Sequence, residues 1–560
     1  MTYDIKITGG SIVDGSGQPA YPGDIGIKDG KIVALGDAPG EASQTIDATG
    51  KAVTPGFVDI HTHYDAQVVW DRMLTISPWH GVTTVVLGNC GFGVAPTRPH
   101  QRDLIVGTLE KVEGMSSATL NEGLGDDWPF ETFPEYLDAI EELGTAINVG
   151  VLVGHTPTRL YVMGEEATER EASADEIAQM RDIVVEALDA GALGFATSKS
   201  PTHVGFKGRP VPSRVASLGE LESLASTLEN RDAVMQVTAG KGFWFDEYED
   251  LTRKYGMTIS WTAMLAGMAS PDAHVAQQQR SRELAEQGLA IVPQVTPRPL
   301  CFEFQFKEPF PFEALAVFKP ISSSDLAGKK VLYADTEFRT AVKTKMDNVR
   351  PSFRLAWENS LISSCPSKPE YEERTVIDVA TELGIHTMDL GFDLALENDL
   401  ETRFRMPVAN ADEDEVEKLI TDKNTVIGLS DAGAHASQLC DAGLPTYLLG
   451  HWVRDKGVIA FEEAIRMLSS RPAEVFGISD RGLLQVGRPA DVLVVDPQTV
   501  HCGKLDRIYD QPAGQDRLIA EAFGIESVIV NGILLRQQGE DQVDPKGELP
   551  GQLLRSGAAS

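Results

Sequence analysis

Eight short apolar segments, separated by stretches of helical pattern, constrain the fold of this 560-residue chain more than any other feature. Apolar runs that alternate with helical patterns are typical of βα units and a parallel sheet. The expected strands end before His61 and Cys90, cover residues 147–153, 192–197, 234–238, 257–261 and 290–295, and end before Asp431. Eight such strands predict an α/β fold whose sheet closes into a barrel.

The segment from residue 173 to residue 191 is the clearest of the intervening helices. Ser173 and Glu176 have the spacing of a capping box. Apolar residues at positions 177, 180, 184 and 188 recur on one helical face, and Gly191 is expected to end the helix. The helix should pack its apolar face on the outside of the barrel.

Both ends of the chain differ in pattern from its middle. Residues 3 to about 50 alternate short strand-like runs with Gly and Asp turns, and the same pattern returns near the C-terminus. We therefore expect one small β-sandwich that is built from residues 1–54 and from residues 481–560, where a C-terminal tail also lies. The barrel domain should occupy residues 55–480.

The stretch at about 298–423 is far longer than an ordinary βα connection and is rich in aromatic residues and proline. As an insertion after the seventh strand, it would lie over the active-site face of the barrel and shape a substrate pocket. An equal alternative is a packing arm or a contact between subunits of a homo-oligomer.

The acidic composition argues against several classes of partner. The chain has 49 Lys and Arg residues against 83 Asp and Glu, a formal charge of −34, which opposes encounter with nucleic acid or an anionic membrane.

Five widely spaced cysteines do not indicate a disulfide framework, and the N-terminus lacks the pattern of a signal peptide. No apolar stretch approaches the roughly 20 residues that span a bilayer. We expect a soluble, cytoplasmic protein.

Two histidines follow the first expected strand. His61 and His63 are separated by one residue, and side chains at i and i+2 of a strand point to the same face. Neutral imidazoles at one point bind a borderline divalent ion such as zinc. An isolated pair would more simply be two polar residues at the end of a buried strand. Asp431 and His435, after the eighth strand, supply the context that an isolated pair lacks.

These strand ends resemble the signatures of a known superfamily. The sequences are Pro55-Gly56-Phe57-Val58-Asp59-Ile60-His61-Thr62-His63, Gly81–Val86, Gly88–Phe92, Asp431-Ala432-Gly433-Ala434-His435, Arg471-Pro472-Ala473, Asp480-Arg481-Gly482 and Gly487–Asp491. They resemble the amidohydrolase superfamily, and within it the N-acyl-D-amino-acid deacylase (D-aminoacylase)-like family. The resemblance covers nearly the whole chain. It implies a TIM-like (β/α)8 metal-dependent hydrolase barrel with a small β-sandwich built from both chain termini.

The resemblance also implies roles for four residues. It places His61, His63 and Asp431 at one metal position and makes Cys90 a further ligand, although a buried cysteine is often only a small apolar residue. The expected cofactor is a divalent metal, Zn2+ above all, with one or two ions. Asp431 would also accept a proton from the attacking water and pass it to the departing nitrogen.

The chain departs from this family at the fifth and sixth strands. Family members end each of these strands in a metal-binding histidine, whereas residues 235–238 and 259–262 read Met-Gln-Val-Thr and Ile-Ser-Trp-Thr. The metal is therefore expected either to use the first-strand and last-strand ligands alone or to recruit substitutes, for which the candidates are Cys90, His155 and Gln236. Loss of the metal is a third alternative.

Further side chains are candidates for substrate binding. His155 and Arg159 follow the third strand and could polarise a carbonyl or hold a carboxylate, while a structural histidine at a strand end is the equal alternative. Arg298, after the seventh strand, could bind an anionic group. His435 is expected to orient the loop of Asp431.

Two other residues near strand ends receive simpler interpretations. Lys199 follows the fourth strand, where many superfamily members carry a carboxylated lysine. Its place two residues beyond Thr197 favours an ordinary surface lysine. His203 lies in a loop with Gly205 and Gly208 and could face a substrate, but a solvated loop histidine is the simpler interpretation.

The predicted function is hydrolysis of a non-peptide C–N amide bond in a small molecule by metal-activated water. The first alternative is a hydrolase of a cyclic amide, an ester or another acyl conjugate on the same scaffold, because a fold does not determine a substrate. The second alternative is a metal-free binding or scaffolding protein.

Overall fold

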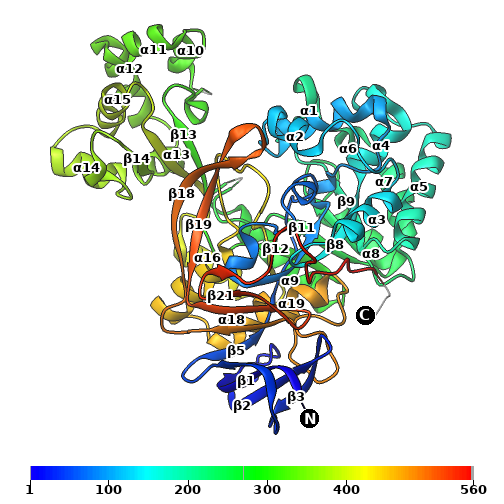
Figure 1. The fold of residues 1–560 in the computed structure, drawn as a ribbon. Coiled ribbons are helices and arrows are strands. Elements are labelled where there is room, and N and C mark those ends of the chain that lie inside the picture. The colour runs from blue at the N-terminus through cyan, green and yellow to red at the C-terminus, as the bar shows by residue number, and fades with distance from the viewer. Residues whose placement is uncertain (1, 269, 314, 557–560) are drawn as a thin grey trace. The chain divides into compact units, whose positions relative to one another are not determined.

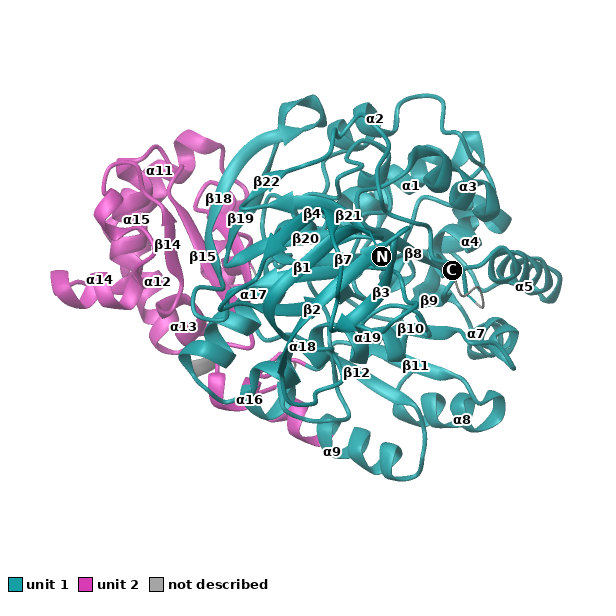
Figure 2. Cartoon of the chain, turned by 60° about the horizontal axis from the view of Figure 1, so that its bottom comes forward, with its two compact units in different colours: residues 1–264, 277–298, 417–560 teal, residues 265–276, 299–416 magenta. Residues whose placement is uncertain are grey.

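The computed structural model describes residues 2–268, 270–313 and 315–556. The chain divides into two compact units, which Figure 2 distinguishes by colour. Unit 1 contains residues 1–264, 277–298 and 417–560, and unit 2 contains residues 265–276 and 299–416.

Eight parallel strands form the central sheet of unit 1, and each strand pairs with its neighbours along the chain. In order they are β6 (Phe57–Asp59), β7 (Val82–Leu87), β8 (Asn148–Gly154), β9 (Gly194–Ser198), β10 (Val234–Thr238), β11 (Thr258–Thr262), β12 (Ile291–Val295) and β16 (Val426–Ile427). The strands are almost continuously buried, as expected for a parallel sheet covered on both faces. The predicted barrel is confirmed.

Backbone hydrogen bonds join the first and last strands just beyond their regular ends. The amide of Asp431 donates to the carbonyl of His61 over 3.2 Å, and the amide of His63 donates to the carbonyl of Ala432 over 2.7 Å. A parallel bridge also pairs Thr62 with Ala432. The sheet therefore closes at the residues for which a metal site is predicted.

Helices surround the barrel strands of unit 1 (Figure 1). They are α1 (Arg102–Val112), α2 (Ser117–Leu124), α3 (Phe133–Leu143), α4 (His155–Met163), α5 (Ala174–Asp189), α6 (Pro212–Val215), α7 (Leu218–Ala225), α8 (Phe245–Tyr255), α9 (Ala273–Glu286), α16 (Glu413–Ile420), α17 (Leu444–Tyr447), the π-helix η11 (Leu448–Asp455), α18 (Phe461–Leu468) and α19 (Ser470–Val475). Short 3-10 turns lie at η1 (Gln67–Val69), η2 (Ser77–His80), η3 (Asn89–Gly91), η4 (Pro99–Gln101), η5 (Gly164–Thr168), η6 (Phe206–Gly208) and η7 (Ser226–Leu228). The capping box predicted at Ser173 and Glu176 is present at the start of α5.

Strands from both ends of the chain form one nine-stranded sheet in unit 1. Its strands are β1 (Tyr3–Ile12), β2 (Tyr21–Lys28), β3 (Lys31–Gly36), β4 (Ala42–Asp47), β5 (Ala52–Pro55), β17 (Val492–Val495), β20 (Ile525–Val530), β21 (Ile533–Gln537) and β22 (Glu540–Asp541). The two ends meet where β17 pairs antiparallel with β5. Ile, Val and Ala side chains from both ends share one buried core. The predicted β domain from both termini is confirmed as a sheet of nine strands, and its predicted boundaries at residues 54 and 481 stay a prediction.

A long hairpin lies outside this sheet. Strands β18 (His501–Gln511) and β19 (Gln515–Phe523) pair with each other across the turn η12 (Pro512–Gly514). The hairpin, orange in Figure 1, runs from the nine-stranded sheet to α2, where Thr119 Oγ1 donates to the carbonyl of Pro512. The amide of Leu518 also donates to the carbonyl of Ala436 over 2.7 Å. The hairpin thus holds the loop that follows Asp431.

Unit 2 contains a three-stranded antiparallel sheet and several helices. The strands, in the order β13-β15-β14, are β13 (Leu300–Gln305), β15 (Arg403–Ala409) and β14 (Leu361–Ser364). The helices are α10 (Lys319–Ser322), α11 (Leu326–Ala334), α12 (Thr336–Asp347), α13 (Pro351–Glu358), α14 (Val376–Leu383) and α15 (Thr387–Glu397), with short turns η8 (Phe310–Phe312), η9 (Ala316–Phe318) and η10 (Pro369–Tyr371). Aromatic residues such as Phe304, Phe306 and Trp357 form its buried core. The aromatic residues of the predicted insertion therefore pack within this unit.

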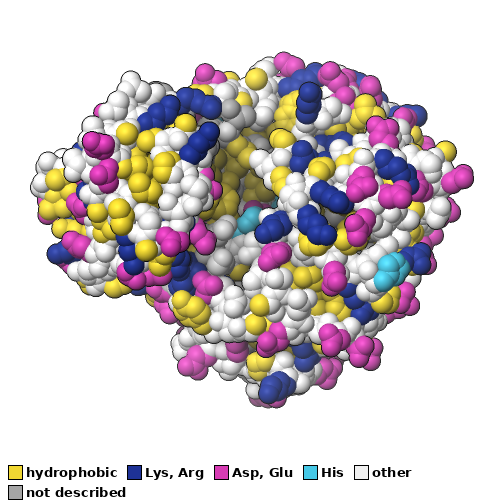
Figure 3. All heavy atoms as spheres, turned by 90° about the horizontal axis from the view of Figure 1, so that it is seen from above, with side chains coloured by type: hydrophobic (Ala, Val, Ile, Leu, Met, Phe, Trp, Pro, Cys, Tyr) yellow, Lys and Arg dark blue, Asp and Glu magenta, His cyan; other side chains and the backbone are white. Residues whose placement is uncertain are grey.

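The described residues include no helix that is both long and apolar enough to cross a membrane. On the face drawn in Figure 3, Asp and Glu side chains are scattered among basic and apolar ones. The formal charge of −34 is therefore not gathered into one acidic patch on that face.

A methyl group at Gly194 should destabilise the barrel. A Cβ atom at this position of β9 would lie 1.9 Å from the carbonyl oxygen of Val234 on β10, so the two strands would have to separate. We expect Gly194→Ala to lower stability by at least about 2 kcal/mol, measured as the urea midpoint of unfolding. Gly219→Ala is the matched control, because Gly219 is an exposed residue of α7 whose nearest neighbour would be 4.0 Å away. Equal midpoints for the two variants would contradict the prediction.

Candidate metal and catalytic site

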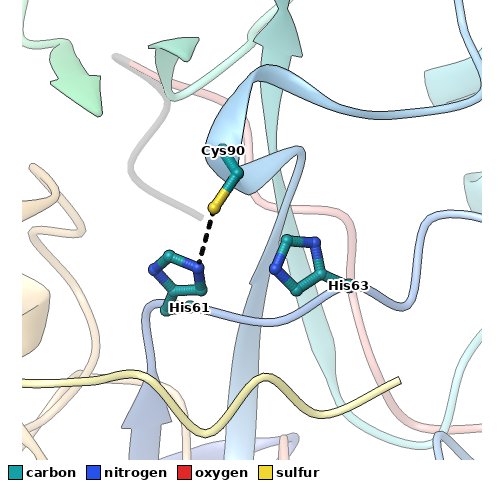
Figure 4. Close-up of side chains that lie close together, drawn as sticks. All are labelled: His61, His63 and Cys90. Carbon is teal, nitrogen blue, oxygen red and sulfur yellow. Dashed lines mark hydrogen bonds between the residues drawn. The ribbon is translucent and has the colours of Figure 1, made fainter. Parts of the chain in front are cut away.

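His61 and His63 lie directly after β6 and are almost completely buried, with 1% and 5% of their surfaces exposed. Their ring centroids are 5.3 Å apart. The strand ends at Asp59, and the backbone of both histidines is then held by the hydrogen bonds that close the barrel. Figure 4 shows that both rings lie beside the side chain of Cys90.

Cys90 lies in the tight turn η3 after β7 and has a left-handed backbone, with φ of 58°. Its amide donates to Oε1 of Gln236 over 2.7 Å. Its Sγ lies 3.4 Å from Nε2 of His61. Gln236, one of the candidate substitute ligands, therefore orients Cys90 through its backbone.

Asp431 completes the group from the other end of the chain. It follows β16, has a left-handed backbone with φ of 46° and leaves 24% of its side chain exposed. Its Oδ1 lies 3.4 Å from Nε2 of His61 and 3.8 Å from Nε2 of His63. The structure thus brings together the four residues that the sequence analysis assigned to the metal.

The spacing of these atoms suits a divalent cation. Zinc bonds of about 2.0–2.3 Å in tetrahedral geometry place ligand atoms about 3.3–3.8 Å apart. The contacts of His61 Nε2 with Cys90 Sγ and Asp431 Oδ1 are both 3.4 Å. One ligand atom from each of His61, His63 and Cys90 also lies within 4.8 Å of the other two. The nitrogen, sulfur and oxygen donors are those that zinc prefers.

The protonation of the histidines suits the same cation. Burial lowers the pKa of His61 to about 4. Burial also lowers the pKa of His63 well below its usual value, and the charges of the nearby His61, His435 and His203 lower it further. Both imidazoles are therefore neutral at pH 7, and the neutral form is the one that binds metals.

The pKa values of the carboxyl groups at the site are raised, whereas those of the histidines are lowered. Burial raises the pKa of Asp431, Asp59 and Asp65 to about 7. Burial with the charges of Asp431 and Asp65 raises the pKa of Glu113 well above its usual value. Several buried carboxyl groups around neutral imidazoles make a pocket that a divalent cation would stabilise.

The outer nitrogen of each site histidine faces a residue that the sequence analysis missed. His61 Nδ1 lies 2.6 Å from Oε1 of Gln294 on β12, whose Nε2 donates to Oγ of Ser260 on β11. His63 Nδ1 lies 3.2 Å from Oε1 of Glu113. No local pattern marks Glu113 or Gln294, because each reaches the site through the fold.

Asp59 was also missed, although its position in the sequence carried a signal. It precedes His61 by two residues, so strand periodicity places it on the same face as the histidines. Its Oδ1 accepts a hydrogen bond from the amide of His61 over 3.2 Å, and the hydroxyl of Ser430, next to Asp431, donates to the carbonyl of His61 over 3.1 Å. Asp59 and Ser430 therefore both hold the backbone of His61.

The fifth and sixth strands end in threonines at the positions where the family resemblance implied histidines. Thr238 ends β10 and Thr262 ends β11, and their hydroxyl groups lie 3.3 Å apart. Burial raises the pKa of the Cys90 thiol well above its usual value, and the neighbouring Thr238 opposes part of this rise.

The prediction that His155 and Arg159 bind substrate needs correction. Both side chains are completely buried, and both bind Glu220 of α7, with His155 Nε2 at 2.8 Å from its Oε1. The other ring nitrogen of His155 lies 2.8 Å from Oγ1 of Thr197. Both side chains lack exposed surface and are already bound to Glu220, which leaves no exposed atom for a substrate. His155 is therefore the structural histidine that was the alternative prediction, and it is not a substitute metal ligand.

Arg298 and His435 lie in different surroundings. Arg298 Nε is 3.4 Å from Oδ1 of Asp441, and its guanidinium lies over the ring of Tyr447. Its charge is therefore already paired with a carboxylate, and an anionic substrate would have to compete for it. The amide of His435 donates to the carbonyl of Glu113, and this bond fixes the loop that carries Asp431.

Lys199 and His203 are more constrained than expected for surface residues. Lys199 Nζ donates to the carbonyls of Arg214 and Ala216 over 2.9 and 2.6 Å, so its amine is bound by backbone acceptors. His203 Nδ1 lies 2.7 Å from Oγ of Ser198. Its ring packs on Phe92 at 5.0 Å, which corrects the prediction of a solvated loop histidine.

Comparisons with known proteins find relatives that match nearly the whole chain. A model of the amidohydrolase family matches residues 44–317 and 332–534. An uncharacterized protein of Mycobacterium tuberculosis is 30% identical over 541 residues, covering 89% of this chain and 85% of that protein. A D-aminoacylase of Alcaligenes xylosoxydans xylosoxydans is 28% identical over 544 residues, covering 96% and 95%. A solved structure of an N-acyl-D-glutamate deacylase from Bordetella bronchiseptica is also similar to this chain, with a TM-score of 0.64 and 27% identity. The match covers 99% of this chain and 100% of that chain, and that protein is complexed with zinc and a phosphonate mimic of the tetrahedral intermediate.

Removing the carboxylate of Glu220 should destabilise the protein through its buried partners. Glu220→Gln leaves the buried guanidinium of Arg159 without its counter-charge. Breaking a buried pair in this way costs about 3–5 kcal/mol, which a chemical denaturation curve would measure. Glu222→Gln is the control, because Glu222 lies on the same helix in an exposed ion pair with Lys254 and exposed pairs contribute little. A Glu220→Gln variant as stable as the control would contradict the structural role.

Proposed function

The chain belongs to the amidohydrolase family and is a metal-dependent hydrolase of carbon–nitrogen bonds other than peptide bonds; within this class we propose that it removes the acyl group from the nitrogen of a small N-acyl amino acid. The single observation that carries the proposal is the position of His61 Nε2, 3.4 Å from both Cys90 Sγ and Asp431 Oδ1. This spacing supports a divalent metal centre at the end of the barrel.

We assign the metal to His61, His63, Cys90 and Asp431. All four side chains project from the strand ends at which barrel enzymes carry out catalysis. A divalent ion held there supplies a Lewis acid, which makes water acidic enough to attack near neutral pH and polarises the substrate carbonyl. Because threonines occupy the strand ends where family members add histidines, we propose a single ion.

We assign proton transfer to Asp431. Its side chain keeps 24% of its surface exposed, whereas the two histidines are almost completely buried, so the carboxylate can reach water and substrate. One Oδ would take a proton from the attacking water and deliver it to the departing nitrogen. The products are then a carboxylic acid and a free amine, and Asp431 returns to its starting state.

The names of two relatives support the substrate class. One relative is a D-aminoacylase and another is an N-acyl-D-glutamate deacylase. We therefore propose an N-acyl-D-amino acid as the substrate. We also propose the cytoplasm as the compartment, on the basis of five widely spaced cysteines.

Replacement of the proposed proton carrier should stop turnover without unfolding the chain. We expect Asp431→Asn to lower kcat by about 10²- to 10⁴-fold, the usual contribution of a positioned acid–base group, while circular dichroism stays unchanged. Chelation should also remove the activity of the wild type, and Zn2+ should restore it. Added Zn2+ should leave Asp431→Asn inactive. Full activity in this variant, or in chelated wild type, would refute the assignment.

A substrate panel tests the proposed specificity. We expect N-acetyl-D-amino acids to be hydrolysed with kcat/KM at least about tenfold above that of their L enantiomers, because roughly 1.4 kcal/mol of differential binding suffices for this ratio. Amine release measures the rate. Hydantoin and a phenyl ester serve as comparison compounds with other scissile bonds. Turnover of one of them, with no N-acyl amino acid hydrolysed, would replace the proposed substrate by the corresponding alternative.

A further inference from the structure

Glu113 is a buried carboxylate beside the metal centre to which the proposed reaction assigns no role. It follows the last residue of α1, in the segment between β7 and β8, and only 3% of its surface is exposed. Its Oε1 lies 3.2 Å from Nδ1 of His63. On the other side of the same ring, Nε2 of His63 faces Oδ1 of Asp431 at 3.8 Å.

His63 Nδ1 needs a partner at this position. It is completely buried and makes no hydrogen bond of good angle with any described residue, although buried polar atoms are normally bonded. The carboxylate of Glu113 lies at an ion-pair distance from it, so a small rotation of the ring would turn the contact into a hydrogen bond. His61 differs, because its Nδ1 already bonds to the neutral amide of Gln294 over 2.6 Å.

Glu113 holds the site through its backbone as well as its side chain. Its carbonyl accepts a hydrogen bond from the amide of His435, in the loop that carries Asp431. The next residue, Gly114, has φ of 60°, and a Cβ there would lie 3.1 Å from Nδ1 of His435. The loop and the end of α1 are therefore in close contact, and Glu113 touches elements from both halves of the metal centre.

We propose that Glu113 is a positioning residue that holds the His63 imidazole with its Nδ1–H toward the carboxylate and its Nε2 lone pair toward the metal. This inference rests on the proposed function, because it takes His63 as a metal ligand. A carboxylate behind a metal-binding histidine fixes its tautomer and strengthens it as a donor. The fifth and sixth strands of this chain supply no histidine ligands. A stronger bond from His63 to the metal would therefore compensate for part of the metal affinity that such ligands provide.

Metal affinity tests the proposal directly. We compare wild type, Glu113→Gln and the control Glu110→Gln, whose carboxylate lies one turn earlier on α1. The Kd for Zn2+ is measured by competition with a chromophoric chelator. We expect Glu113→Gln to raise Kd by about 10- to 100-fold and Glu110→Gln to leave it unchanged. The visible bands of the Co2+-loaded protein should also shift in Glu113→Gln only.

A Kd for Glu113→Gln within threefold of wild type would overturn the proposal. If this variant does not fold, a crystal structure of the zinc-loaded wild type decides: Glu113 bonded to His63 Nδ1 supports the proposal, and Glu113 turned away overturns it. Wild-type protein that binds no Zn2+ would refute the proposed function itself. The wild-type Kd for Zn2+ therefore tests the proposed function, and the ratio of the Glu113→Gln Kd to the wild-type Kd tests the role of Glu113.

Discussion

The rest of the structure depends on the hydrogen bonds that close the barrel between its first and last strands. The amides of Asp431 and His63 donate to the carbonyls of His61 and Ala432, and Oγ of Ser430 donates to the carbonyl of His61 across 369 residues of sequence. Because the same segments carry three of the four proposed metal ligands, His61, His63 and Asp431, one set of backbone bonds both closes the sheet and brings these three together. The left-handed backbone of Asp431 turns its side chain toward His61 as the strand leaves the ring.

A second constraint is electrostatic. Several carboxyl groups and the two buried histidines His61 and His63 lie around one point, and burial opposes their charged forms. Burial keeps the imidazoles of His61 and His63 neutral and raises the pKa of Asp431, Asp59 and Glu113. A divalent cation reverses this preference for the carboxyl groups, because it stabilises their ionised forms. The pocket is therefore built for a positive charge.

The sequence predicted the barrel well because its signals are local. Apolar runs of strand length, the spacing of His61 and His63, and the capping box at Ser173 each lie within a few residues, where backbone geometry determines which side chains share a face. Partners supplied by distant segments carried no such signal. Glu113 follows a helix after the second strand and Gln294 lies in the seventh strand, yet both reach the outer nitrogens of the site histidines.

The sequence by itself determined the alternation of strands and helices and the residues that lie at strand ends, because periodicity and chain order are written in it. Only the tertiary structure decided which of those residues face the centre. His155 follows the third strand as predicted, but its side chain binds Glu220 and is completely buried. The physical reason is that the direction of a side chain beyond a strand end depends on the partner that compensates its polar atoms, and that partner comes from a part of the chain far away in sequence.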